Sequence, residues 1–207
     1  MNTDTPLKAL ALIATLKPSP SASSSEKIAR DVGEELAKHN VEIEYIRVVD
    51  YDLRPGVEAD MGNGDQWPEL RQKMLEADIL LLSTPTWMGH MSSVAMRVLE
   101  RLDAELSETD ESGKLLTFGK VAGVAVVGNE DGAHSIVADT FQALNDVGFT
   151  IPAQGCTYWN GEAMQTIDYQ DLDTIPEKVQ QTNRTLAQNS AHLARLLKSV
   201  NYPTIEG

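Results

Sequence analysis

The alternation of strand-length apolar stretches with segments of helical periodicity constrains the fold of this chain more than any other feature. Five apolar stretches recur at wide spacing, at residues 7–14, 41–49, 78–83, 121–127 and 149–158. The intervening segments are long enough for crossover helices, which parallel strands require. Right-handed crossovers place these helices on both faces of the sheet. The sequence therefore predicts an α/β fold, a doubly wound five-stranded parallel sheet in a three-layer sandwich.

The segments between the strands carry apolar residues on one helical face. Ile28, Val32 and Leu36 follow the spacing i, i+4, i+8, which is typical of an amphipathic helix. Further helical patterns cover residues 70–77, 91–106 and 135–147, and a last helix covers about residues 175–197.

Two of the apolar stretches indicate where their strands lie in the sheet. Residues 41–49 begin with strict alternation of apolar and acidic side chains, which indicates an edge strand with one solvated face. Residues 78–83 form an apolar run typical of a central parallel strand. Five strands then fit the order 2-1-3-4-5, whose winding reverses between the first and third strands. Ligands bind at such a reversal, so the loops after strands one, three and four are the predicted site.

The length of 207 residues fits one domain. We expect a single domain over residues 1–207, with a core over about residues 7–160, the helix at about 175–197 and a short C-terminal tail. The glycine-rich residues 52–66 and the polar residues 107–120 are predicted to be surface excursions rather than linkers.

Charge and cysteine content exclude several classes of function. With 17 Lys and Arg against 31 Asp and Glu, the formal net charge is −14. Such a surface repels phosphate backbones and acidic lipids, so we expect neither nucleic-acid binding nor membrane-surface binding. The lone Cys156 has no cysteine partner, which suits a reducing compartment. The first 16 residues lack a basic segment, and their apolar run at residues 9–16 is too short to span a bilayer, so we expect no membrane insertion and a cytoplasmic protein.

The first of the three loops, at residues 15–25, is dense in hydroxyl groups and runs directly into a helix. A helix N-terminus offers unpaired backbone N–H groups and a positive dipole end, which together bind phosphate. Lys17 adds positive charge. The alternative interpretation is a flexible loop in which Ser24 or Ser25 merely caps the helix. Neither G-x-x-x-x-G-K-[ST] nor G-x-G-x-x-G is present, so a mononucleotide phosphate is the remaining candidate.

The other two loops carry an aromatic side chain and several glycines. Trp87 follows the third strand, where it is suited to flank a planar heterocycle, and its alternative role is a lid or an oligomer contact. Residues 128–134 bracket polar side chains between two glycines. Their alternative role is an ordinary turn with Asp131 capping the next helix.

Taken together, the segments LKPSPSASSS, TPTWMGHMSS and GNEDGAH resemble the flavodoxin-like NAD(P)H-dependent FMN reductases and NAD(P)H:quinone oxidoreductases, over about residues 7–160. The resemblance implies that the first loop binds the FMN phosphate through Lys17, Ser19, Ser23, Ser24 and Ser25. It implies that the second loop runs along the ribityl chain and the ring through Pro85, Thr86, Trp87, Met88 and Gly89. It implies that the third loop contacts the pyrimidine side of the ring through Gly128, Asn129, Asp131, Gly132 and His134.

The activity implied by this resemblance is hydride transfer from NAD(P)H through bound FMN to a small acceptor such as a quinone or free flavin. The flavin carries this chemistry, so no catalytic side chain is required, although His90 and His134 are candidate hydrogen-bond donors. Four scattered histidines give no metal cluster, and His39 and His192 lie in helical patterns. Tyr158 and Trp159 either line the substrate side of the flavin or pack beneath the last helix.

The resemblance further implies a homodimer or homotetramer, in which residues 52–67 would cap a partner's site. Two alternatives to the enzyme stay open. One is a flavodoxin-type electron carrier without NAD(P)H turnover of its own, for which the acidic surface suits docking to basic redox partners. The other is a binding module of the same fold without a cofactor.

Overall fold

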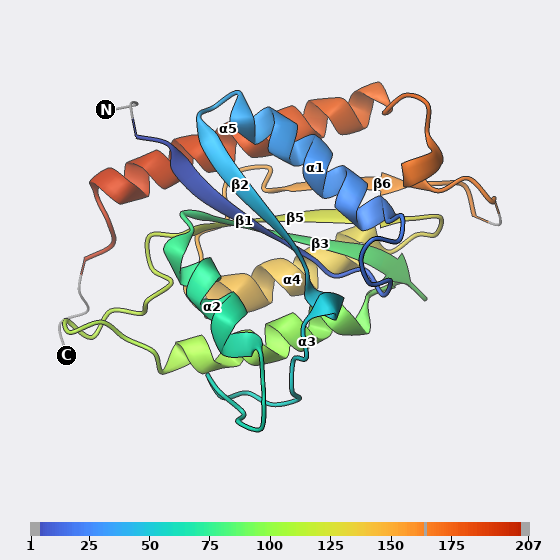
Figure 1. The fold of residues 1–207 in the computed structure, drawn as a ribbon. Coiled ribbons are helices and arrows are strands. Elements are labelled where there is room, and N and C mark those ends of the chain that lie inside the picture. The colour runs from blue at the N-terminus through green and yellow to red at the C-terminus, as the bar shows by residue number, and fades with distance from the viewer. Residues whose placement is uncertain (1–4, 164, 204–207) are drawn as a thin grey trace.

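Five parallel strands form the main sheet of the computed structural model, which describes residues 5–163 and 165–203 (Figure 1). Their order is β2 (Val41–Arg47), β1 (Leu7–Ile13), β3 (Ile79–Trp87), β5 (Val121–Gly128) and β6 (Cys156–Asn160). This is the predicted order 2-1-3-4-5, and the predicted doubly wound sheet is confirmed. A short additional strand, β4 (His90–Met91), pairs antiparallel with the end of β3.

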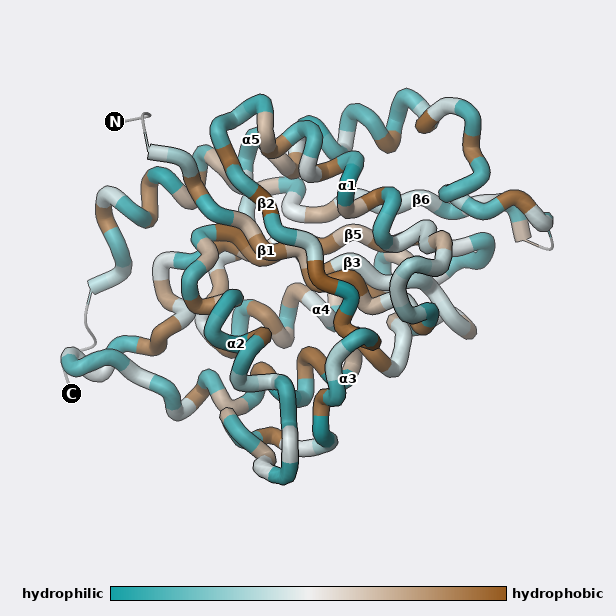
Figure 2. The backbone as a smooth tube through the Cα atoms, in the orientation of Figure 1, coloured by the Kyte–Doolittle hydropathy of each residue, from teal (hydrophilic) through white to brown (hydrophobic). Residues whose placement is uncertain are grey.

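Helices cover both faces of the sheet (Figure 1). Helices α1 (Ser24–Ala37) and α5 (Glu177–Ser199) pack on one face. Helices α2 (Trp67–Glu76), α3 (Ser93–Leu102) and α4 (Ala133–Asp146) pack on the other. The strand residues alternate between these two layers: Leu10 and Leu12 of β1 join the second layer, while Ala11 and Ile13 join the first. Figure 2 shows the hydrophobic residues gathered along β1 and β3.

Several predicted boundaries are wrong for local reasons. The stretch predicted as a strand at 149–158 makes one bridge, from Val121 to Thr150, and then turns before β6 begins. Pro152, which has no N–H to donate, and Gln154, with φ of 54°, interrupt the ladder. The stretch at 41–49 ends in the 3-10 turn η1 (Val48–Asp50), and the helix at 91–106 divides into α3 and η2 (Asp103–Leu106).

Buried hydroxyl groups join the strand ends at the reversal point. The backbone N–H of Ala14 donates to the carbonyl of Ser83 at 2.8 Å, and the Ser92 hydroxyl donates to the carbonyl of Ala14 at 2.6 Å. The Ser92 N–H donates to the Thr84 hydroxyl, and the Ser83 hydroxyl donates to the carbonyl of Ser25. These bonds fix the start of α1 and the loop after β3 relative to the end of β1.

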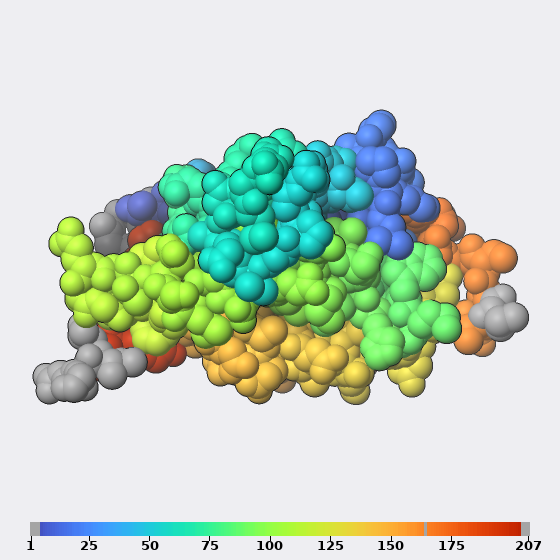
Figure 3. Space-filling model, turned by 90° about the horizontal axis from the view of Figure 1, so that it is seen from below, coloured from blue at the N-terminus to red at the C-terminus, as the bar shows by residue number. Residues whose placement is uncertain are grey.

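The excursion at residues 52–66 folds back onto α3 of its own chain. Arg101 on α3 is fully buried, and its guanidinium forms an ion pair of 2.8 Å with the equally buried Asp65. The same guanidinium donates to the carbonyls of Arg54 and Glu58, and it lies over the ring of Trp67. Figure 3 shows the excursion in teal as a bulge against the green α3 region. Whether it also caps a partner's site stays a prediction.

Within residues 5–163 and 165–203, every helix falls short of the length or of the apolar character that a membrane span requires.

Replacing Asp65 with alanine tests this anchoring. The variant leaves the Arg101 guanidinium buried without its carboxylate partner. We therefore expect the free energy of unfolding to fall by about 3–5 kcal/mol, measured by urea denaturation.

Asp52→Ala is the matched control, because it removes the same charge from the same excursion. Asp52 pairs with Arg54 on the surface, and such exposed pairs contribute about 0–1 kcal/mol.

Burial raises the pKa of Asp65, but its backbone hydrogen bonds and Arg101 lower the pKa by more. Its stabilisation is therefore present above the unfolded pKa of about 3.9 and is lost as the pH falls through the lower folded value. Equal stability of the two variants at neutral pH would contradict the anchoring.

Candidate functional site

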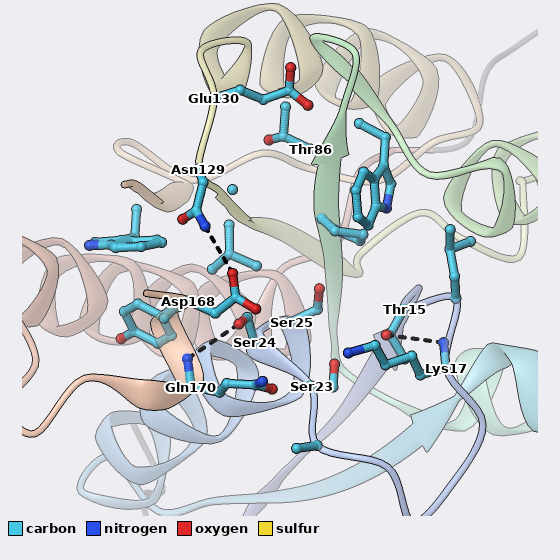
Figure 4. Close-up of a pocket in the computed structure, with 18 residues that line it drawn as sticks. Thr15, Lys17, Ser23, Ser24, Ser25, Thr86, Asn129, Glu130, Asp168 and Gln170 are labelled. Carbon is cyan, nitrogen blue, oxygen red and sulfur yellow. Dashed lines mark hydrogen bonds between the residues drawn. The ribbon is translucent and has the colours of Figure 1, made fainter. Parts of the chain in front are cut away.

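A cavity of about 320 Å³ lies at the carboxyl ends of β1, β3 and β5. Nine of the residues that the sequence selected line it: Lys17, Ser23, Ser24, Ser25, Pro85, Thr86, Trp87, Gly128 and Asn129. They come from all three predicted loops. The reversal in strand order therefore brings the three loops together around one cavity, as Figure 4 shows.

The serine-rich loop presents the start of α1 to this cavity. Ser23 is the N-cap, and its hydroxyl accepts from the N–H of Glu26 at 3.3 Å. The cap is thus Ser23 rather than Ser24 or Ser25. The first turn of any helix leaves N–H groups without intrahelical partners, and here that turn lines the cavity. The amine of Lys17 points toward the same serines (Figure 4). This end of the cavity has the features of an anion site.

The loops after β3 and β5 are locked to each other at the opposite wall. The β3–β4 hairpin turns at Met88 and Gly89, which both have positive φ. The N–H of Met88 donates to the carboxylate of Glu130 at 2.8 Å. Gly132, with φ of 139°, lies so close that a Cβ there would be 2.6 Å from the carbonyl oxygen of Gly89. Only glycine fits at that contact. The contact between the two loops holds the exposed Trp87 beside the cavity.

A third wall comes from the connection between β6 and α5, where the sequence indicated no site. We call residues 168–170 the closing segment. Asp168 accepts from the Nδ2 of Asn129 at 2.9 Å, and the N–H of Gln170 donates to the Ser24 hydroxyl at 3.2 Å. Both residues line the cavity, together with Tyr169.

Tyr169 anchors the closing segment to α1. Its ring is fully buried against Trp159, and its hydroxyl donates to a carboxylate oxygen of Asp31 at 2.7 Å. Burial, with the hydrogen bond to Asp31 next, raises the pKa of Tyr169. The hydroxyl therefore stays protonated and keeps donating to Asp31 at neutral pH.

Three buried side-chain oxygens around the cavity have no hydrogen-bond partner in the described part of the chain: Thr86 Oγ1, Asn129 Oδ1 and Gln170 Oε1. Leaving such an atom unpaired costs about 1–3 kcal/mol. Because these oxygens are buried in the cavity wall, a ligand that brings hydrogen-bond donors would remove this cost only after the side chains rotate toward it. The cavity therefore suits a molecule that carries both an anionic group and several N–H or O–H donors.

Other predicted site residues lie outside the cavity lining. They are Ser19, Met88, Gly89, His90, Asp131, Gly132 and His134. The Ser19 hydroxyl donates to Asp50 at 2.6 Å. The Nε2 of His134 lies 3.1 Å from the hydroxyl of Tyr158, so these two side chains contact each other rather than the cavity. Trp159, by contrast, lines the cavity, as one of its two predicted roles requires.

Sequence reasoning missed Thr15, Leu16, Ala22, Val127, Glu130 and the closing segment as lining residues. Four of the first five lie within the predicted loops at residues 15–25 and 128–134, although they were not selected individually, and Val127 directly precedes the third loop. The closing segment carries only one local signal, the capping box of Asp168 and Asp171 that starts the short turn η3 (Tyr169–Asp171). In residues 5–163 and 165–203, no group of three or more His, Cys, Asp or Glu side chains is placed to hold a metal ion.

The chain is similar to known flavin proteins over nearly its whole length. It is 31% identical over 210 residues to the 8-demethyl-8-aminoriboflavin-5'-phosphate synthase of Streptomyces davaonensis, covering 96% of this chain and 81% of that protein. The crystal structure of RosB with bound 8-demethyl-8-formylriboflavin-5'-phosphate superposes with a TM-score of 0.85 and 31% identity. That match covers 95% of this chain and 82% of that chain.

A further relative differs greatly in length. The chain is 35% identical over 200 residues to the divalent metal cation transporter MntH of Mycobacterium bovis. The match covers 93% of this chain but only 29% of that protein.

The family model described as NADPH-dependent FMN reductase matches residues 7–163. This range contains every strand of the sheet and two of the three walls of the cavity. The chain therefore belongs to the NADPH-dependent FMN reductase family.

Proposed function

We propose that the cavity binds FMN and that the protein transfers hydride from NAD(P)H through this flavin to a small acceptor, such as a quinone or free flavin. The observation that carries the proposal is the pairing, in one cavity, of a helix N-terminus with three buried unpartnered oxygens. FMN matches this pairing, because it joins a dianionic phosphate to a chain of hydroxyl groups and a ring with an N–H donor.

Different residues of the cavity are placed to contact different parts of FMN. The first turn of α1 and Lys17 are placed to bind the phosphate. Asn129 and Gln170 line the cavity, and rotation of their side-chain amides would let Oδ1 and Oε1 accept from hydroxyl or ring N–H groups. Trp87, at the rim and 54% exposed, offers a flat apolar surface beside the ring.

Bound FMN supplies the hydride chemistry, and the chain binds and orients it. No lining side chain needs to act as a general acid or base in this proposal. The electron acceptor is a small molecule that reaches the open side of the cavity. A homodimer or homotetramer belongs to the same proposal.

Ser23→Asp tests the phosphate position. Aspartate caps a helix as well as serine does, so the variant should fold with unchanged or higher stability. Its carboxylate would repel the phosphate, and we expect FMN affinity to fall at least about tenfold in a fluorescence titration, because like charges at close range cost more than about 1.4 kcal/mol.

Ser93→Asp is the control for charge. It adds the same carboxylate to the first turn of α3, where Ser93 is exposed and does not line the cavity. We expect its FMN affinity to match the wild type. If Ser23→Asp also binds FMN like the wild type, the phosphate lies elsewhere.

Anaerobic mixing of the FMN-loaded protein with NADPH and with NADH tests the hydride step. We expect the visible absorbance of the flavin to bleach and to recover when a quinone is added. An electron carrier of the same fold would bind FMN but would not turn over NAD(P)H, so failure to bleach with either nucleotide would favour that alternative.

A second candidate function is chemical modification of the riboflavin-5'-phosphate molecule itself. The likeness to the Streptomyces davaonensis synthase favours it, because it extends over 96% of this chain and so includes the closing segment. Mass spectrometry of the flavin recovered after turnover separates the two functions. Unchanged FMN indicates the reductase, and a new flavin mass indicates the modifying enzyme.

A further inference from the structure

We propose that Arg47, which does not line the cavity, positions the phosphate-binding loop and thereby sets a preference for phosphorylated over unphosphorylated flavin. This inference rests on the proposed function. Arg47 ends β2, and its side chain is only 7% exposed. In the sequence it belongs to the predicted edge strand at residues 41–49.

The Arg47 guanidinium binds the loop from behind through three backbone carbonyls. Its Nη1 donates to the carbonyl of Lys17 at 3.1 Å and to that of Pro18 at 3.0 Å. Its Nη2 donates to the carbonyl of Ser21. One planar, buried donor thus fixes both halves of the loop between β1 and α1.

These bonds determine which backbone groups are free to meet a ligand. A trans peptide points its C=O and its N–H in opposite directions. Since the Ser21 carbonyl points at Arg47, the N–H of Ala22 points away from Arg47, and Ala22 lines the cavity. The other two peptides offer no free N–H, because the nitrogen after Lys17 belongs to Pro18 and the Ser19 N–H donates to Asp50. Arg47 therefore turns three carbonyl oxygens of the loop toward itself and leaves the Ala22 N–H available to an anion.

Arg47 also offsets a negative charge at the start of α1. Its Nε donates to the Glu26 carboxylate at 2.7 Å, and Arg30 donates to the same carboxylate from the helix surface. Burial raises the pKa of Glu26, but the hydrogen bonds and charges of the two arginines lower it by more. Asp50, which accepts hydrogen bonds from Ser19, is a further carboxylate near Arg47. The positive charge that lines the cavity itself is that of Lys17.

Without Arg47, the loop would lose the donor that fixes its conformation, and the Glu26 carboxylate in the first turn of α1 would have one less positive partner. Both effects fall on the part of the ligand that carries the phosphate. A preorganised loop contributes to affinity because binding does not have to order it. Riboflavin has the same ring and hydroxyl chain but no phosphate, so its binding depends little on this loop.

The experiment compares dissociation constants for FMN and for riboflavin, by fluorescence titration, in wild type, Arg47→Met and Arg47→Lys. We expect Arg47→Met to reduce the ratio of FMN affinity to riboflavin affinity at least about tenfold, with riboflavin affinity changed less than about threefold. Arg47→Lys keeps the charge but not the planar guanidinium, so its ratio of FMN affinity to riboflavin affinity should fall between those of the wild type and Arg47→Met. If Arg47→Met does not fold, as judged by circular dichroism, Arg47→Lys decides by the same ratio.

Arg30→Met is the matched control. Arg30 shares the Glu26 carboxylate, is 53% exposed, and donates to none of the three loop carbonyls. We expect this variant to keep the wild-type ratio within about twofold. An unchanged ratio in the Arg47 variants, or an equal loss of both ligands, overturns the inference. Failure of the wild type to bind FMN at all overturns the proposed function instead.

Discussion

The position of β1 between β2 and β3 is the constraint on which the cavity depends. Both pairings are parallel, so the chain must leave β1 toward one side of the sheet and later return on the other. The connections at the end of β1 therefore diverge and leave a space that no connection covers. The buried hydroxyls of Ser83, Thr84 and Ser92 then hold the edges of that space at fixed separation.

The fold follows from the sequence wherever local pattern and global topology agree. The apolar runs of β1, β3 and β5 are buried on both faces, and the spacing of Ile28, Val32 and Leu36 marks the buried side of α1. The β4 strand was missed because its hairpin turn, Met88–Gly89, lacks the Asn-Gly or Asp-Gly signal of such turns. The last strand begins late because Pro152 and Gln154 prevent pairing earlier.

The cavity was predictable only where its residues come from the loops that the strand order selects. Lys17, Trp87 and Asn129 belong to those loops and do line it. The closing segment does not, because its contacts join residues far apart in sequence: Gln170 meets Ser24 across 146 positions. Arg47 was missed for the same reason. The sequence around a charged residue at the end of an edge strand does not indicate which backbone carbonyls its side chain contacts in the folded protein. A single sequence specifies such contacts only through the folded chain.

The closing segment makes the cavity depend on a part of the chain beyond the family match. Residues 7–163, which the family model matches, contain the sheet, the serine-rich loop and the hairpin, yet the third wall comes from residues 168–170. Residues 7–163 alone would leave one side of the cavity open, and the bonds of Tyr169 to Asp31 and of Gln170 to Ser24 hold the wall that closes it. Helix α5 follows this wall in the chain and covers one face of the sheet. The C-terminal part of the chain therefore completes the hydrophobic core and the cavity together.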